Sequence, residues 1–182
     1  MIGFETEEPV VTDRHADMVR RAKLLARQRF PEVRQHAACL HQAWALMAVA
    51  HTEGIRLTLQ AGSAQWVRTY RDCDAQMFGY VADEIDPVRA VVLDLLPEMH
   101  VWVADIARQE IIDPTAGCFP TQCKELIGED WEIEKPPEFL WCHVSQLPQA
   151  AYYRPSMTAT MLAGHFLTRM RDEGRLNPPW RV

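Results

Sequence analysis

Residues 99–117, MHVWVADIARQEIIDPTAG, decide the fold. Residues 99–107 alternate apolar side chains in the manner of a strand. The following QEIIDPT predicts a second strand, which returns antiparallel to the first and ends in a turn at Asp113-Pro114. Such a hairpin brings Asp113 back alongside His100. The pattern therefore predicts a histidine and a carboxylate side by side in an antiparallel sheet.

The chain before this hairpin predicts two helices and a strand. Residues 13–30 repeat apolar side chains at helical spacing, with Thr12 or Asp13 as the N-cap. Residues 38–51 form a second helical segment that contains few polar side chains, so we expect it to be buried. Gly54 is well placed to end this helix. The following IRLTLQAG, residues 55–62, alternates like a half-buried strand.

The rest of the chain adds helices around the predicted sheet. A short helix is expected after Asp86-Pro87, and a last helix over residues 156–171. Residues 116–150 are rich in proline, glycine and cysteine and are expected to be loop-like. This order predicts an α+β fold, in which a buried helix packs on an antiparallel sheet, in one domain spanning residues 1–182.

Composition and charge narrow the function classes. The chain has 182 residues, a net charge of -6 and a pI of about 5.6, without a basic block. These features argue against nucleic-acid binding and against an anionic membrane surface, and an acidic surface suits a basic peptide. The N-terminal residues lack the pattern of a signal peptide, and the number of cysteines, five, is odd. We therefore expect a reduced, cytoplasmic protein.

Cys39 opens the predicted buried helix, which is a favourable place for a nucleophile. The unsatisfied N–H groups of a helix N-terminus favour a thiolate, and they can hold the oxyanion that forms when sulfur attacks a carbonyl. The thiolate needs a base and the base needs an orienting group, roles that suit His100 and Asp113. Asp105 is a rival orienting group, but its odd offset from His100 points it to the opposite face of the sheet. Cys39, His100 and Asp113 each also have a purely structural interpretation. Cys39 can be a packed core cysteine, His100 a hydrogen-bonded strand histidine, and Asp113 a turn residue whose carboxylate bonds its own backbone.

Two stretches together resemble the transglutaminase-like superfamily. CLHQAWALMAVAHTEGIRLTLQAG, residues 39–62, is similar to the family's cysteine-opened helix, which is followed by Gly-Ile, a basic residue, an alternating strand and a glycine. HVWVADIARQEIIDPT, residues 100–115, resembles its second half: His-x-Trp, a strand, a turn, a strand and Asp-Pro-Thr. The two stretches cover about 40 residues.

The resemblance implies a papain-like cysteine fold with Cys39 as nucleophile, His100 as base and Asp113 as orienting residue. The family transfers an acyl group from an amide or thioester carbonyl through a thioester intermediate, without a metal or cofactor in its small bacterial members. The acceptor is an amine in cross-linking, or water in proteolysis and deamidation. Because small relatives are more often peptidases, deamidases or amide hydrolases, we expect hydrolysis of a protein or peptide amide.

The match also has departures and open positions. Ala37 stands where a glycine is common in the family. Residues 63–98 and 116–150 lie outside the resemblance and are expected to be insertions that shape the cleft. Besides the backbone N–H of Cys39, Gln35 and His36 are candidate oxyanion donors. Trp102 shares the face of His100, so we expect it to cover the cleft and contact the substrate.

Two alternative functions remain open at this stage. One is a binding or scaffold module that keeps the fold without the chemistry. The other is a structural protein that binds zinc, although the Cys-x4-Cys spacing is looser than that of zinc ribbons. The residues considered for zinc are His36, Cys39, His41 and His51 in one group, and Cys118, Cys123, Cys142 and His143 in a second.

Overall fold

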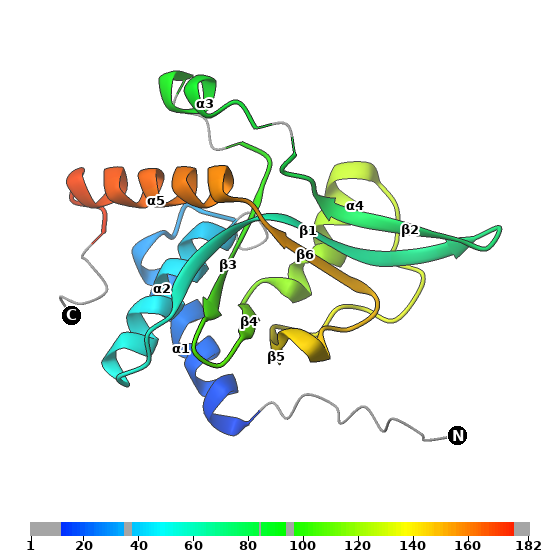
Figure 1. Cartoon of the computed structure of the whole chain (residues 1–182), viewed down its shortest axis with the longest axis horizontal. Coiled ribbons are helices and arrows are strands. Elements are labelled where there is room, and N and C mark those ends of the chain that lie inside the picture. The colour runs from blue at the N-terminus through cyan, green and yellow to red at the C-terminus, as the bar shows by residue number, and fades with distance from the viewer. Residues whose placement is uncertain (1–11, 35–37, 84, 94–96, 177–182) are drawn as a thin grey trace.

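The computed structural model describes residues 12–34, 38–83, 85–93 and 97–176, which form an α+β fold with a curled antiparallel sheet (Figure 1). The helices are α1 (Asp13–Arg29), α2 (Cys39–Thr52), α3 (Pro87–Leu93), α4 (Phe119–Ile127) and α5 (Met157–Asp172). The strands are β1 (Thr58–Arg71), β2 (Asp74–Tyr80), β3 (His100–Asp105), β4 (Glu110–Asp113), β5 (Leu140–His143) and β6 (Ala151–Pro155).

The long strand β1 organises the sheet, whose order is β2-β1-β3-β4-β5 with β6 also paired to β1. Gly62 pairs with His100 of β3, Ala64 pairs with Tyr80 of β2, and both β1 residues also pair with β6. A strand residue has one neighbour on each edge, so β3 and β2 follow one another along the same edge of β1. The start of β3 and the end of β2 therefore meet, although 19 residues of chain separate Tyr80 from His100.

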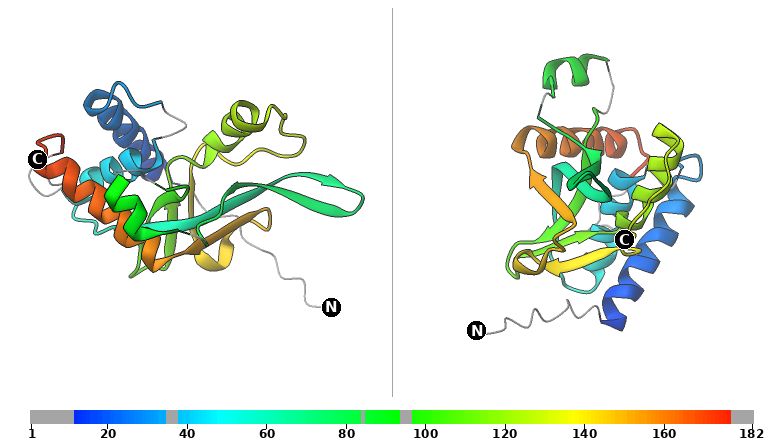
Figure 2. Two further views of the ribbon diagram at one scale, coloured as in Figure 1. Left: turned by 90° about the horizontal axis from the view of Figure 1, so that it is seen from above. Right: turned by 90° about the vertical axis from the view of Figure 1, so that its right-hand side faces the viewer.

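Helix α2 is the centre of the core. Ten of its fourteen residues are buried, because α1 covers one side and β3 the other. Helix α1 begins as the sequence predicts, with the Thr12 side chain accepting a hydrogen bond from the backbone of His15. In Figure 2, α1 and α4 stand on the same side of the sheet, toward its opposite ends. Residues of α1, α2 and α4 line a common cavity.

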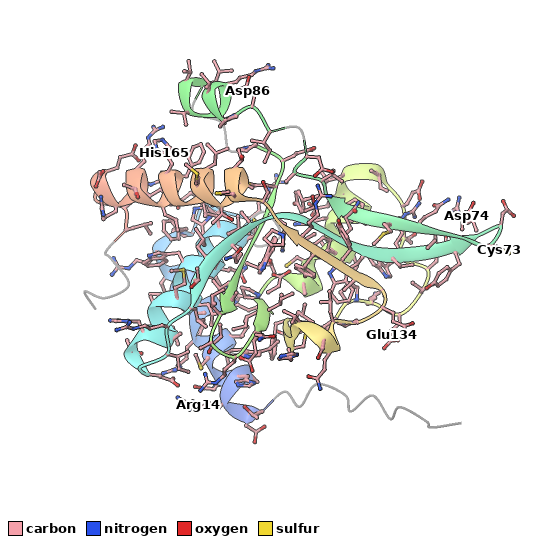
Figure 3. All side chains as sticks on the ribbon, in the orientation of Figure 1. Arg14, Cys73, Asp74, Asp86, Glu134 and His165 are labelled. Carbon is pink, nitrogen blue, oxygen red and sulfur yellow. The ribbon has the colours of Figure 1, made fainter. Side chains whose placement is uncertain are left out.

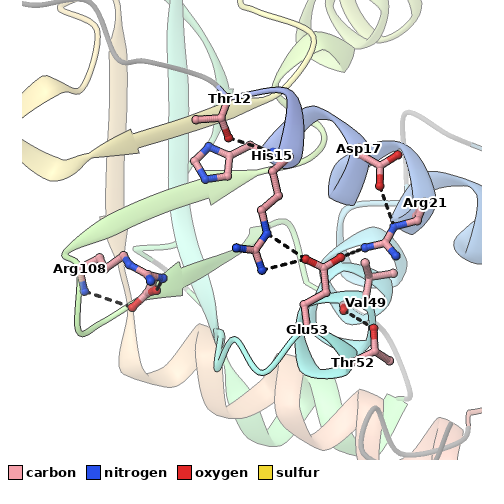
Figure 4. A network of polar contacts seen from close by, with 10 residues as sticks. Thr12, His15, Asp17, Arg21, Val49, Thr52, Glu53 and Arg108 are labelled. Atoms are coloured by element: carbon pink, nitrogen blue, oxygen red, sulfur yellow. Dashed lines mark hydrogen bonds and ion pairs between the residues drawn. The ribbon is translucent and has the colours of Figure 1, made fainter.

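Ion pairs connect α1 to Glu53, the residue directly after α2 (Figure 4). Glu53, directly after α2, accepts hydrogen bonds from Arg14 at 3.1 Å and from Arg21. Both arginine side chains are exposed, so each pair contributes at most about 1 kcal/mol. These exposed ion pairs therefore add little to the stability that α2 gains from the burial of ten of its residues.

Most predicted elements are confirmed, with three differences. The strand after α2 starts at Thr58 and runs to Arg71, well past the predicted end at Gly62. The prediction that residues 116–150 are loop-like is wrong, because they contain α4 and β5. The strands β2 and β6 were not predicted. β5 and β6 have only four and five residues, too few for alternation to stand out.

The regions that the resemblance leaves out contribute to the sheet. Residues 63–98 hold the second half of β1, all of β2 and α3. The β1–β2 hairpin extends as an arm, with Cys73 exposed at its tip (Figure 3). Among the described residues, no helix is long and apolar enough to cross a membrane.

Gly62 is required by the close approach of β6 to β1. A Cβ at this position would collide with the backbone carbonyl of Arg154 and lie 2.8 Å from the backbone nitrogen of Ser156. We expect Gly62→Ala to lower the free energy of unfolding by about 1–3 kcal/mol, because the two strands must separate to admit the methyl group.

Gly164 offers a matched control on α5, where an added Cβ meets nothing within 4 Å. Gly164→Ala should raise the free energy of unfolding by about 0.5–1 kcal/mol, since alanine favours the helix. Urea unfolding of both variants measures the difference. Equal stability of the Gly62→Ala variant and the wild type would show that the close approach of β6 to β1 does not exclude a side chain at position 62.

Candidate active site

A buried ion pair joins the two strands of the predicted hairpin. His100 begins β3 and Asp113 ends β4, and the imidazole Nε2 lies 2.8 Å from the Asp113 Oδ2. Their side chains are 1% and 0% exposed. The predicted proximity of His100 and Asp113 is thus present in the structure, at hydrogen-bond distance.

The Asp-Pro-Thr sequence explains how Asp113 is held. The backbone N–H and the hydroxyl of Thr115 both donate to Oδ1 of Asp113, at 2.8 and 2.7 Å. Pro114 restricts the backbone of this turn, which favours the local side-chain bond. The other carboxylate oxygen, Oδ2, remains for His100 and for the hydroxyl of Tyr153, which donates to it at 2.6 Å. Asp113 can therefore bond its own turn through Oδ1 and the imidazole of His100 through Oδ2 at the same time.

Tyr153 connects this carboxylate to β6 and β1. Its hydroxyl donates to Asp113 and accepts from the indole Nε1 of Trp66 at 3.2 Å. A chain of hydrogen bonds thus runs from Trp66 through Tyr153 to Asp113 and His100, across four strands. Each bond fixes the position of the next group, so the imidazole has one orientation.

The electrostatics favour a charged pair. Burial lowers the pKa of His100, but the charge of Asp113, the hydrogen bond to it and an interaction with the Cys39 side chain raise that pKa to about 10. Burial raises the pKa of Asp113, yet His100 and the hydrogen bonds from Tyr153 and Thr115 hold it below its usual range. The stabilising effect of His100 is thus complete below pH 6.5 and is lost as the pH rises through about 10.

Aromatic rings surround the imidazole and exclude water from it. Phe119 lies 5.1 Å from it between ring centroids, and Tyr80 stacks on it at 5.5 Å with an interplanar angle of 24°. Trp102 and Tyr153 complete the shell at 6.3 and 6.4 Å. In this dry surrounding the ion pair is little screened.

Cys39 is the first residue of α2 and is 9% exposed. Ala38 precedes it without a side-chain cap, so the helix N–H groups remain available near the sulfur. The Cys39 side chain interacts with His100 and contributes to its raised pKa. Since Asp113 occupies Nε2, the thiol is left with Nδ1, which is buried and has no hydrogen-bond partner among the described residues. The structure thus brings Cys39, His100 and Asp113 together.

Tyr80 and Cys118 also lie in this site. Burial, followed by the charges of Cys39 and Glu98, raises the pKa of Tyr80 to about 12, so its hydroxyl is protonated and can donate. The Tyr80 side chain is half-buried, and its hydroxyl makes no hydrogen bond to another described residue. The half-buried thiol of Cys118 has a raised pKa from burial and lies within reach of the charges of Asp113 and Cys39.

The other predicted site residues have different outcomes. Gln35, His36 and Ala37 lie outside the described residues. Trp102 shares the face of His100 as expected, but at 2% exposure it forms the inner wall and not a substrate contact. Asp105 bonds Arg108 and not His100, which agrees with its opposite orientation.

The residues considered for zinc do not form a site in the part of the chain that the structure covers. No three histidine, cysteine or carboxylate side chains are grouped there as a metal ion would require. Cys123, for example, donates to the backbone carbonyl of Glu129.

Sequence reasoning missed Tyr80, Tyr153 and Cys118. Tyr80 and Tyr153 reach His100 and Asp113 through strand pairing with β1, so no local spacing marks them. Cys118 follows Asp-Pro-Thr by three residues, a spacing that marks it only once Asp113 is placed in the site.

Comparison with known proteins supports the fold and leaves the activity open. No family model matches the chain, and no curated protein matches it. A solved structure described as "The crystal structure of genomics APC5867" is similar, with a TM-score of 0.50 and 14% sequence identity over 95% of this chain and 78% of that one. At this identity the likeness concerns the fold alone.

Asp113→Asn should leave His100 neutral at pH 7. The substitution removes the charge that raises the pKa of His100 and keeps the burial that lowers it, so the pKa is expected to fall from about 10 to below 6.5. A ¹⁵N NMR titration of the imidazole nitrogens measures this change.

Tyr153→Phe is the matched control, because it removes one hydrogen bond to Asp113 and keeps the carboxylate. The pKa of His100 should stay above 6.5 in this variant. An imidazole that remains charged at pH 8 in Asp113→Asn would contradict the charge-pair account.

Proposed function

We propose that the protein is a transglutaminase-like cysteine enzyme that transfers or hydrolyses the acyl group of a protein or peptide amide. The observation that carries the proposal is the constellation of Cys39 at a helix N-terminus, His100 beside it and Asp113 bonded to the far imidazole nitrogen. Two strands and a helix from separate parts of the chain supply these three groups. The resemblance of residues 39–62 and 100–115 to the superfamily supports the same activity.

In the proposed acylation step, the Cys39 thiolate attacks the amide carbonyl carbon and forms a C–S bond. The carbonyl oxygen becomes an oxyanion, and the protonated His100 gives its proton to the leaving amine as the C–N bond breaks. A thioester and a free amine, or ammonia from a side-chain amide, result. Asp113 stabilises the imidazolium while it carries this proton.

In the second step, water attacks the thioester and His100 accepts its proton. The tetrahedral intermediate collapses as the C–S bond breaks, the carboxylic acid leaves, and the Cys39 thiolate and the protonated His100 are regenerated. An amine in place of water gives an isopeptide bond by the same proton transfers. We favour water because small members of the superfamily that the sequence resembles are more often hydrolases.

The oxyanion needs donors that point at the carbonyl oxygen. The backbone N–H of Cys39 is one, at the start of α2. Tyr80 is the second donor in this proposal, because its hydroxyl is protonated, the charge of Cys39 acts on it, and its ring stacks on His100. A phenol in this place gives its hydrogen bond to the developing charge without being able to serve as a base at neutral pH.

Iodoacetamide alkylation tests the nucleophile. Alkylation of Cys39 should be at least about tenfold faster in the wild type than in His100→Gln, because the proposed mechanism requires the imidazole to assist the sulfur nucleophile. Mass spectrometry of the alkylated peptides identifies the reacting cysteine. Cys73, exposed at the hairpin tip, serves as the internal reference for an ordinary thiol.

Either of two results would contradict the nucleophile assignment. One is a Cys39 that reacts no faster than Cys73, and the other is unchanged turnover in Cys39→Ala. The fold without the chemistry, a binding or scaffold module, would then be the better account.

Tyr80→Phe separates oxyanion binding from thiolate reactivity. Acylation of Cys39 by 4-nitrophenyl acetate forms an oxyanion and should slow about 100-fold in this variant. Alkylation by iodoacetamide forms none, and the phenyl ring still stacks on His100, so its rate should change less than about twofold. Equal slowing of both reactions would show that Tyr80 acts through His100 instead.

A further inference from the structure

A cavity of about 390 Å³ lies beside the candidate active site, between α1, α2 and α4. Gln42, one turn along α2 from Cys39, and Cys118 line its inner side. The thiol of Cys118 lies within the electrostatic reach of Cys39, so the cavity adjoins the nucleophile. A substrate bound across Cys39 therefore has room to extend into this space.

The lining of this cavity is positive although the chain as a whole is acidic. Lys23 and Arg27 enter it from α1, and Lys135 enters from the segment after α4, while Glu138 is the carboxylate that lines it. Among the described residues that line the cavity, three carry a positive charge and Glu138 carries a negative one, in a protein whose net charge is -6. A concave site of one sign concentrates the field and attracts ligands of the opposite charge.

The two lysines of this lining differ in whether their charge is paired. Lys23 is 19% exposed and bonds the Glu138 carboxylate at 2.9 Å, so this pair is partly neutralised. Lys135 is exposed and makes no ion pair with any described residue, so its charge is available to a ligand. Burial and the charges of Asp113 and Cys39 raise the pKa of Cys118, whereas the charge of Lys23 lowers it, so Cys118 lies between the cations of the cavity and the candidate active site.

From this placement we infer that the cavity binds acidic side chains of the acyl-donor peptide, so that the enzyme prefers a donor with glutamate or aspartate near the reacting amide. The inference rests on the proposed function and narrows its substrate class. It reverses the expectation from net charge, which favours a basic peptide: the local charge at the site has the opposite sign to the sum over the chain.

A matched set of N-acetyl tripeptidyl chloromethyl ketones tests the inference without a known substrate. The ketones alkylate an active-site cysteine, and they carry Glu, Gln or Lys in turn at each of the three positions, with alanine elsewhere. The second-order rate of Cys39 labelling is read by mass spectrometry. At one position the Glu probe should react about tenfold faster than its Gln counterpart, and the Lys probe more slowly than both.

Charge reversal assigns the preference to the cavity. Lys135→Glu should bring the Glu-to-Gln rate ratio to about one or below. Arg89→Glu, on α3 and outside the cavity lining, changes the net charge equally and should keep the ratio. In wild type the ratio should also shrink between 50 mM and 500 mM salt, because exposed charges are screened.

The outcomes separate this inference from the proposed function. Labelling of Cys39 at equal rates by the Glu and Gln probes, or fastest labelling by the Lys probe, overturns the acidic preference and leaves the acyl-transfer proposal standing. A ratio that falls as far in Arg89→Glu as in Lys135→Glu overturns the role of the cavity. Failure of every probe and of iodoacetamide to label Cys39 selectively overturns the proposed function, and the inference with it.

Discussion

The buried carboxylate of Asp113 is the constraint on which the site depends. Its two oxygens accept four hydrogen bonds, two from Thr115 and one each from Tyr153 and His100. A carboxylate at 0% exposure is costly unless its oxygens are satisfied and its charge is paired. The four donor groups, one of which is the imidazolium of His100, meet that requirement together, and they also leave the imidazole with one orientation.

The pairing of strands in the sheet places the side chains that surround His100 and Asp113. One edge of β1 receives β3 and then β2, so His100 and Tyr80 meet at the junction between them. The other edge receives β6, which carries Tyr153 to Asp113. Gly62 lies where β3 and β6 face each other across β1, and the lack of a side chain there permits their approach. The geometry of one strand thus sets the surroundings of the candidate base.

The helices complete the arrangement from one side of the sheet. α2 presents Cys39 at its uncapped N-terminus, next to β3, whose first residue is His100. α1 and α4 flank the same point, and the cavity between them carries a positive lining. Net charge describes solubility and long-range attraction, whereas recognition depends on the few charges within about 10 Å of a ligand. A chain of net charge -6 can therefore offer a cationic surface beside its candidate active site.

The sequence by itself determined the elements with strong periodicity and the pairing that a tight turn enforces. The helices around Met18 and Trp44 follow from helical spacing, and the contact of His100 with Asp113 follows from a short hairpin. Only the tertiary structure decided the length of β1, the existence of β6 and the place of α4, because these depend on pairing between distant segments. Tyr80 and Tyr153 joined the site for the same reason. Local patterns record what a segment prefers, and strand neighbours on a shared edge are chosen by the packing of the whole sheet.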